Sequence, residues 1–403
     1  MTVDVLRRPA RAERRARVAV AVLFLTNGAL FANLLPRYPQ IKADLQMGNA
    51  TYGLAVAAFP AGAIAAGLAA GVLIRRLGSA RVAVGSTLLT GAGILAAALA
   101  DSVALFAGAL FLAGAMDAIT DVAQNAHGLR VQRRYGRSII NSFHAIWSIG
   151  AVTGGSMAAG AIALGLPRGQ HLAISAVVFA AAACVALRFC LPGPDTEPAV
   201  DADAADDRGP QPVRRTTTGA RTACVLAALV LIATAGSLVE DAGNSWAALY
   251  LAGSLHASAA LAASGYIALV GAQFVGRLVG DRLVDRFGQR AVARTGGLIA
   301  AAGMGLALAV PTVPGTVLGF AAAGLGVATL VPAAMHEADE LPGLKPGSGL
   351  TVVSWLMRLG FLLSPPVVGL VADAASLRVG LLVVPLAGLL VLSLAGVLRT
   401  RRR

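Results

Sequence analysis

Carboxylate and amide side chains recur at one helical spacing inside an apolar stretch that runs from residue 103 to 127. The spacing i, i+4, i+7 and i+8 places four of them on one helical face: Asp117, Asp121, Gln124 and Asn125. Inside a membrane a charged side chain costs about 2.5–3.5 kcal/mol, and intramembrane acids commonly relay protons. We predict proton coupling through the two aspartates and substrate binding through the two amides. A buried structural network is the alternative.

The next apolar stretch, from residue 138 to 164, carries a second polar stripe. Asn141, His144 and Ser148 share one helical face, with Trp147 beside it. Histidine changes its charge near neutral pH, and an indole ring can stack on a sugar or a drug. We predict that Asn141, His144 and Trp147 bind the substrate and that this stripe faces the first one.

Two adjacent acids, Glu240 and Asp241, lie in the apolar stretch from residue 222 to 250, with Asn244 one turn beyond Glu240. Two neighbouring carboxylates in a low dielectric do not both ionise cheaply, so one of them is expected to hold a proton. We predict proton coupling by this pair and substrate binding by Asn244. The alternative is that the segment already lies in the outer headgroup region, where acids are tolerated.

Other polar side chains in apolar stretches complete the predicted substrate site. They are Asn27 and Asn33 near the N-terminus, Tyr266 and Gln273 further along, and Trp355 and Arg358 near the C-terminus. Arg358 needs a protein carboxylate or an anionic group of the substrate as its partner. No acid accompanies Asn27 and Asn33 in the first stretch, so coupling must use acids elsewhere.

The elements that hold these residues are predicted from the spacing of charges. There are 30 uncharged residues between Asp44 and Arg75 and 42 between Arg294 and Glu337. About 20 apolar residues of helix cross a bilayer, so such lengths indicate a membrane protein with several crossings. We predict twelve helices, at 18–36, 51–74, 80–100, 103–127, 138–164, 170–190, 222–250, 259–281, 291–310, 314–336, 347–372 and 378–398.

Basic residues set the predicted orientation. If the N-terminus lies inside, 27 of the 33 basic residues fall on cytoplasmic segments and four on outer loops. This asymmetry predicts that both termini are cytoplasmic, in the cytoplasmic (inner) membrane. The net charge of +13 therefore follows from the topology and favours contact with anionic lipid. Nucleic acid is not an expected partner.

The chain divides into two related halves. The segment 191–220 is rich in Asp, Pro and Thr and has no apolar period, so we predict a cytoplasmic linker between an N-terminal half, 1–190, and a C-terminal half, 221–403. A shift of 210 residues places Gly114 on Gly324 and Gly150 on Gly360. Repeated six-helix halves are typical of transporters that rock around a midplane site.

One short motif occurs in both halves, at residues 71–81 and 280–290. The second copy, Gly280-Asp281-Arg282-Leu283-Val284-Asp285-Arg286-Phe287-Gly288-Gln289-Arg290, resembles the hallmark loop of the major facilitator superfamily, and the similarity extends over the whole chain. The first copy has Arg75 where the superfamily has an aspartate. The resemblance implies an all-α membrane fold of twelve helices in two pseudo-symmetric halves, and solute transport by alternating access.

Two stretches are similar to a bacterial branch near the fucose-type sugar permeases. One begins with Asp121-Val-Ala-Gln-Asn125 and the other is Glu240-Asp241-Ala-Gly-Asn244-Ser-Trp246. The Gly-x-x-x-Gly-Pro pattern of many drug:proton antiporters is incomplete in the fifth predicted helix, because no proline follows Gly154. The resemblance therefore favours a sugar-like or small metabolite substrate. A drug exporter and a membrane sensor or scaffold remain as alternatives.

The resemblance also implies a cytoplasmic latch. In the superfamily the acid after the second helix lies near the start of the eleventh helix and complements the positive end of its dipole. Arg75 occupies the place of that acid here, and the same positive end would repel it. The acids before the eleventh helix predict a latch of exchanged polarity, in which they pair with Arg75 and Arg76, while Asp281 and Asp285 pair with arginines 133, 134 or 137. The alternative is that Arg75 and Arg76 only follow the positive-inside rule. The predicted members of the latch are Arg75, Arg76, Arg133, Arg134, Arg137, Asp281, Asp285, Arg286, Asp339 and Glu340.

The sequence offers no catalytic constellation. It contains neither a phosphate-binding glycine loop with lysine nor a His-Cys metal cluster, and its three cysteines, Cys184, Cys190 and Cys224, have no ligand spacing. We predict no enzyme activity and no cofactor. The expected protein is a monomeric secondary transporter whose partners are a small-molecule substrate, protons and the bilayer.

Overall fold

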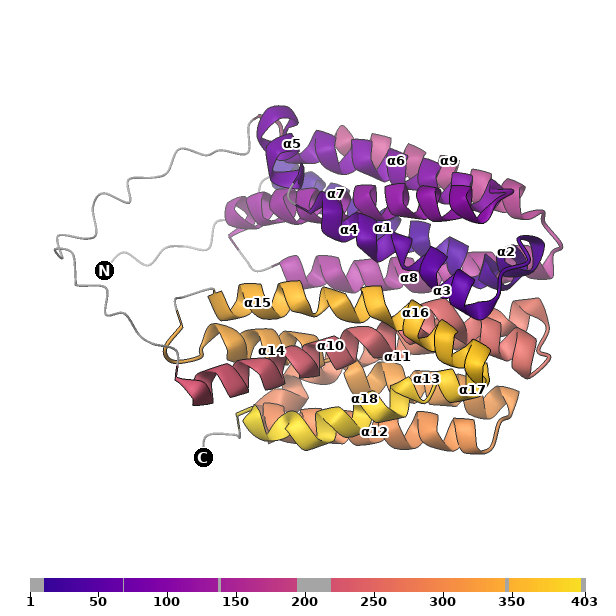
Figure 1. Ribbon diagram of the computed structural model, residues 1–403. Helices are drawn as coiled ribbons and strands as arrows, with labels where there is room; N and C mark the ends of the chain where they lie inside the picture. Colours follow the sequence, from indigo (N-terminus) through magenta and orange to yellow (C-terminus); the bar gives the residue numbers. More distant parts are fainter. Residues whose placement is uncertain (1–10, 68, 137–138, 194–218, 345–347, 400–403) are drawn as a thin grey trace.

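The computed structural model describes residues 11–67, 69–136, 139–193, 219–344 and 348–399, and this part of the chain is helical, without strands. The helices run along one common direction and are packed side by side (Figure 1). Twelve helical segments among the described residues are long and apolar enough to cross a membrane. The predicted fold class and the number of crossings are therefore confirmed.

Helices from residues 11–187 gather on one side of the bundle (Figure 1). Their bounds are α1 (Arg11–Leu34), η1 (Leu35–Arg37), α2 (Tyr38–Asp44), α3 (Asn49–Val56), α4 (Ala58–Ala66), α5 (Ala69–Leu77), α6 (Ser79–Leu99), α7 (Val103–Tyr135), α8 (Ile140–Ala163) and α9 (Arg168–Leu187).

Helices from residues 220–397 form the other side (Figure 1). They are α10 (Ala220–Leu249), η3 (Tyr250–Ser254), α11 (Ala259–Phe287), α12 (Gln289–Ala309), α13 (Val313–Val327), α14 (Leu330–Asp339), α15 (Ser348–Leu356), α16 (Arg358–Ala374), α17 (Leu377–Gly380), α18 (Val383–Leu394) and η4 (Ala395–Val397). We call the end of the bundle near Arg11 and Arg399 the terminal end, and the opposite end, near α2 and α17, the distal end.

Three helices are longer than predicted. The first crossing begins at Arg11, α7 continues to Tyr135 and α11 continues to Phe287. The glycines that follow α7 and α11 have positive φ, 70° at Gly136 and 83° at Gly288, which ends a helix without Cβ strain. The motif residues that we placed in loops therefore lie on helical turns, since polar residues can extend a helix beyond the hydrocarbon.

Prolines divide two of the crossings. A proline removes one backbone donor and its ring collides with the carbonyl four residues earlier. Pro60 lies four residues after Val56, where α3 ends, and Pro332 lies four residues after Ala328, between α13 and α14. The eleventh crossing is also interrupted, between α15 and α16, so Arg358 begins a new helix instead of lying inside a continuous one.

Glycines related by the 210-residue shift occupy equivalent helix crossings. A Cβ at Gly114 of α7 would overlap the carbonyl oxygen of Phe59 in α4, and a Cβ at Gly324 of α13 would overlap that of Leu269 in α11. Small residues let helix backbones approach closely in a membrane protein. The internal repeat inferred from the sequence thus has a structural counterpart, while the boundaries drawn for the two halves and the linker stay a prediction.

Candidate functional site

Asn27 of α1 connects three helices of the N-terminal half. Its side-chain nitrogen donates to Asp117 Oδ1 at 2.7 Å, and its oxygen accepts from Trp147 Nε1 at 2.8 Å and from Gln124 Nε2 at 3.5 Å. Asn27 and Gln124 are buried, with 6% and 0% of their surface exposed. The amide of Asn27 therefore holds Asp117 and Trp147 in place, and four predicted site residues meet in one network.

Asp121, one turn beyond Asp117 on α7, faces the space between the two halves. Its carboxylate accepts from Asn125 Nδ2 at 3.0 Å, and it interacts electrostatically with His144 of α8 and with Arg358 of α16. The side chains of Asp121 and His144 are exposed although both lie within membrane-spanning segments. Because Arg358 belongs to the other half, Asp121 lines a solvent-accessible space at the interface.

The guanidinium of Arg358 also reaches the second crossing. Its Nη1 lies 3.8 Å from the position of a Cβ on Gly67, at the end of α4. Trp355 lies three residues earlier, near the end of α15, and is 59% exposed. Arg358 of the C-terminal half therefore lies close to groups of the N-terminal half, and its role in binding the substrate stays a prediction.

Glu240 of α10 forms the matching acidic centre of the C-terminal half. Gln273 Nε2 of α11 donates to Glu240 Oε2 at 2.7 Å, and Arg277 Nη2 lies 3.8 Å from the same oxygen. Tyr266 of α11 interacts with Glu240 electrostatically and is 4% exposed. The Arg277 side chain is 41% exposed and interacts with His144, so this centre also faces the other half.

Asp241 belongs to a separate group nearer the distal end, which we call the distal cluster: Tyr38, Tyr52, Asp241 and Trp246. Tyr52 lies edge-on to Tyr38 and to Trp246, with ring centroids 5.7 Å and 5.0 Å apart. Both tyrosines interact with Asp241 electrostatically. The three aromatic side chains are at most 1% exposed, so they cover the carboxyl group.

Hydrogen bonds join the two halves at the distal end. The Tyr52 hydroxyl donates to the Ser245 carbonyl oxygen at 2.7 Å. Asp373 of α16 accepts from the backbone of Asn49 at 3.0 Å and of Ala50 at 2.8 Å, at the first turn of α3. A Cβ at Gly53 of α3 would overlap the carbonyl oxygen of Pro365. The distal end is thus closed by backbone contact between α3 and α16.

The structure departs from the prediction at Asn33. This residue is 0% exposed, and its side-chain oxygen contacts His171 Nε2 at 2.9 Å and accepts from Ser175 Oγ at 3.1 Å, both on α9. Its amide is hydrogen-bonded within the N-terminal half and does not line the interface.

Asn244 is partly buried and its side-chain oxygen has no partner. The side chain of Asn141 and the whole of Arg137 lie outside the described residues.

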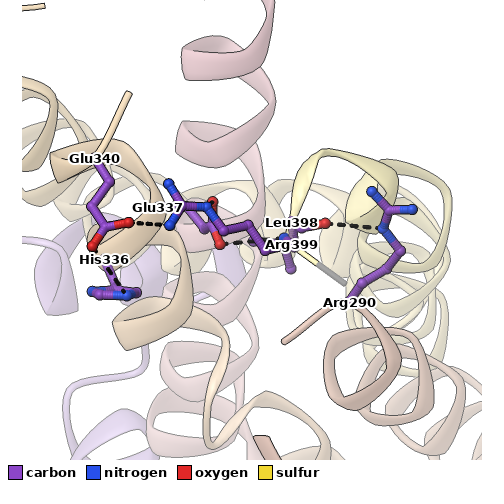
Figure 2. A network of polar contacts seen from close by, with 6 residues as sticks. All are labelled: Arg290, His336, Glu337, Glu340, Leu398 and Arg399. Carbon is purple, nitrogen blue, oxygen red and sulfur yellow. Dashed lines mark hydrogen bonds and ion pairs between the residues drawn. The ribbon is translucent and has the colours of Figure 1, made fainter. Parts of the chain in front are cut away.

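The predicted latch residues lie at the terminal end of the bundle. Exposed members there are Arg75, Arg76, Arg133, Arg134, Asp281, Asp285, Arg286, Asp339 and Glu340. In this structure Glu340 pairs with Arg399 of its own half instead of Arg75 (Figure 2). The cross-half latch stays a prediction for another conformation of the protein.

Figure 2 shows the contacts around Glu340. We call the group formed by Arg290, Glu337, Glu340 and Arg399 the C-terminal clasp. Arg399 Nε lies 3.2 Å from Glu337 Oε2, and the backbone nitrogen of Arg399 donates to Glu337 Oε1 at 3.2 Å. Arg290 Nε donates to the Leu398 carbonyl oxygen at 2.9 Å. The clasp ties the end of α14 to the start of α12 and to the residues after η4.

Several residues of the interface were missed by the sequence reasoning. Tyr38, Tyr52 and Asp373 flank short loops at the distal end, and nothing in their local pattern indicates which element of the other half they meet. Arg277 was also not assigned to the site. Its position one turn beyond Gln273 was the available signal.

The described residues form a bundle of twelve candidate membrane-spanning helices, in which Asp121 and His144 of the N-terminal half meet arginines of the C-terminal half, and this is the architecture of a membrane transporter. The family model of the Major Facilitator Superfamily matches residues 20–283 and 226–403. The uncharacterized transporter y4wD of Sinorhizobium fredii is 31% identical over 384 residues, which cover 94% of this chain and 97% of that protein. The chain belongs to the Major Facilitator Superfamily.

Solved structures agree in fold. The nucleoside transporter NupG has a TM-score of 0.70 at 13% identity, covering 96% of this chain and 99% of that one. The D-xylose-proton symporter has a TM-score of 0.66 at 14% identity, with coverage of 94% and 97%. At these identities the likeness concerns the fold, and a transporter of this family binds a small-molecule substrate within the membrane.

Proposed function

We propose that this protein is a proton-coupled secondary transporter of a small polar solute, with a sugar-like compound or small metabolite as the favoured substrate class. The observation that carries the proposal is the meeting of acids from both halves with His144, Arg277 and Arg358 at one interface. A carrier that exposes such groups alternately to two sides can exchange protons with both. The resemblance to the fucose-type branch supports the substrate class.

The solute site lies between the halves. Asn125, His144 and Arg358 surround Asp121, and Trp355 offers an exposed indole for stacking. Asn244, with its unpartnered oxygen, supplies an acceptor from α10. Hydrogen-bonding groups beside an aromatic ring fit a polyol or a nucleoside better than a lipophilic cation. The nucleoside and the sugar for which NupG and the D-xylose-proton symporter are named belong to this class.

The proton carrier is one of four acids: Asp117, Asp121, Glu240 or Asp241. Each lies in a membrane-spanning segment, and each contacts an amide, a hydroxyl or a basic group that responds to its charge. Protonation of such an acid changes the contacts between helices, which links proton binding to the movement of the halves.

We place the terminal end in the cytoplasm and the distal end outside, with the protein a monomer in the cytoplasmic membrane. The 1–190 and 221–403 halves rock about the central site, joined by the 191–220 linker. In the inward-closed state the exposed arginines Arg75 and Arg76 pair with Asp339 and Glu340. Reporter fusions in the linker and at Arg378 test the orientation, since they should signal from opposite sides.

Uptake into proteoliposomes tests the proposed function. The purified protein is assayed with D-xylose, a nucleoside and a cationic dye, with and without an inward proton gradient. Gradient-driven accumulation of a polar solute is the expected result, abolished by a neutral Asn or Gln at the carrier acid. Gradient-driven movement of the dye alone would favour the drug-exporter alternative. Absence of any movement in folded protein would favour a sensor or scaffold.

A further inference from the structure

The four candidate acids differ in how their charge is compensated. Asp121 has His144 and Arg358 nearby, and Glu240 has Arg277 and an amide donor. Asp117 accepts a 2.7 Å hydrogen bond from Asn27. The charged group that acts on each of Asp117 and Asp241 is a like charge on the same helix, but only Asp241 also lacks an amide or basic donor.

The surroundings of Asp241 offer little to an ionised carboxylate. The residue is 6% exposed, one oxygen accepts a 3.3 Å bond from Ser245, and the other has no hydrogen-bond partner. The titratable groups that face it are Tyr38 of α2, Tyr52 of α3 and Glu240, and the Ser364 hydroxyl of α16 is close enough to stabilise the carboxylate charge in part. A buried charge without a counter-ion is strongly unfavourable, whereas a neutral acid is tolerated.

A protonated Asp241 also has an acceptor within its own cluster. The Tyr38 hydroxyl oxygen is buried and unpartnered, as is the Trp246 indole nitrogen. Unpartnered polar atoms in one buried cluster are unusual, because buried polar groups are nearly always hydrogen-bonded. The region is therefore a polar site sealed by the closure of the distal end.

We infer that Asp241 is a gate-linked proton site, which holds a proton while the outer end is closed and releases it to the outer solution when Tyr38, Tyr52 and Trp246 separate. This inference rests on the proposed function and gives one of its four acids a role at the outer gate. The same movement that breaks the bond from Tyr52 to Ser245 exposes the carboxyl group. Solvation then favours ionisation, so the outer-open state binds one proton fewer than the closed state.

Electron spin resonance distances test the inference directly. Spin labels at Ala43→Cys and Val379→Cys report the opening of the outer end, in nanodiscs and with Cys184, Cys190 and Cys224 replaced by serine. One linked proton raises the ratio of open to closed protein by up to about tenfold for each unit of pH. Asp241→Asn should stay closed at every pH, whereas Asp101→Asn, a control at an exposed acid in the loop before α7, should keep the response.

Tyr52→Phe provides a second variant if Asp241→Asn fails to fold. It removes the bond to Ser245 and should raise the open population at every pH without changing the slope. A pH-independent ratio in the unmodified protein would overturn the inference, as would an unchanged slope in Asp241→Asn or a response to sodium instead of protons. Uptake driven by a proton gradient despite such a result would leave the proposed function intact.

Discussion

Asp373 caps a helix that belongs to the other half of the protein. Its carboxylate accepts from the backbone nitrogens of Asn49 and Ala50 and from the Asn49 side chain at 2.9 Å. These nitrogens begin α3, where the free N–H groups and the positive end of the helix dipole favour an anion. The cap exists only while the distal end is closed, so it stabilises one conformation of the carrier and not the other.

Asp373→Ala is therefore expected to move the equilibrium toward the outer-open state. Loss of a helix N-cap costs about 0.5–2 kcal/mol, which corresponds to an increase of about 2- to 30-fold in the ratio of open to closed protein. Asp373→Asn keeps one acceptor oxygen and should have a smaller effect. The measurement is the distance distribution between spin labels at Ala43→Cys and Val379→Cys.

The control is Ser102→Ala, which removes the N-cap of α7 within a single half, where Ser102 Oγ accepts from Leu105. This variant should lower the thermal stability and leave the ratio of conformations unchanged. If Asp373→Ala and Ser102→Ala had the same effect on the ratio, the cap across the interface would not control opening. An unchanged ratio in Asp373→Ala would refute the reasoning outright.

Three further perturbations act within one half and are measured by thermal unfolding in detergent. Asn27→Ala leaves Asp117 and Trp147 without their partner and should cost about 1–3 kcal/mol. Gly114→Ala forces a Cβ into the Phe59 carbonyl and should cost about 1–3 kcal/mol. Arg399→Ala removes the counter-charge of Glu337, whose side chain is 7% exposed, and should cost about 1–3 kcal/mol. Arg399→Lys keeps the positive charge and should lose only part of this stability.

Matched variants decide whether these losses have the stated causes. Gly108→Ala lies in the same helix as Gly114, with open space around it, and should be neutral or slightly stabilising. A similar loss at both positions would contradict the close-contact argument. Glu337→Gln combined with Arg399→Ala should recover stability if an unpaired charge is the cause. An unchanged melting temperature in Asn27→Ala would mean that its network carries no net stabilisation.

The membrane fold could be predicted from the sequence because the order of charged and apolar residues along the chain is sufficient to identify membrane-spanning helices. Uncharged runs such as the one between Asp44 and Arg75 are set by bilayer thickness and need no knowledge of packing. The glycine pairs related by the repeat could be predicted as well, because the 210-residue shift needs no knowledge of packing either. Helix ends were not, because Arg133 and Asp285 continue their helices beyond the hydrocarbon, where hydropathy no longer distinguishes helix from loop.

The candidate site was predicted in part. Helical spacing grouped Asp117 with Asp121, and the structure adds Asn27 to them through a hydrogen bond. Spacing within one helix does not specify which neighbour a side chain meets, so Asn33 was assigned to the interface although it faces α9. Tyr52 and Asp373 were missed because their partners lie in the other half of the chain, at a separation that no local pattern encodes.

The C-terminal clasp changes how the proposed latch at the terminal end must work. Glu340 already has an arginine, so pairing with Arg75 or Arg76 would exchange one cation for another. Exposed ion pairs of this kind are worth about 0.2–1 kcal/mol each, and the difference between two of them is smaller still. The exchange of ion pairs then contributes little to the free energy of closing that end. The gradients of the solute and the proton therefore determine the direction of each cycle.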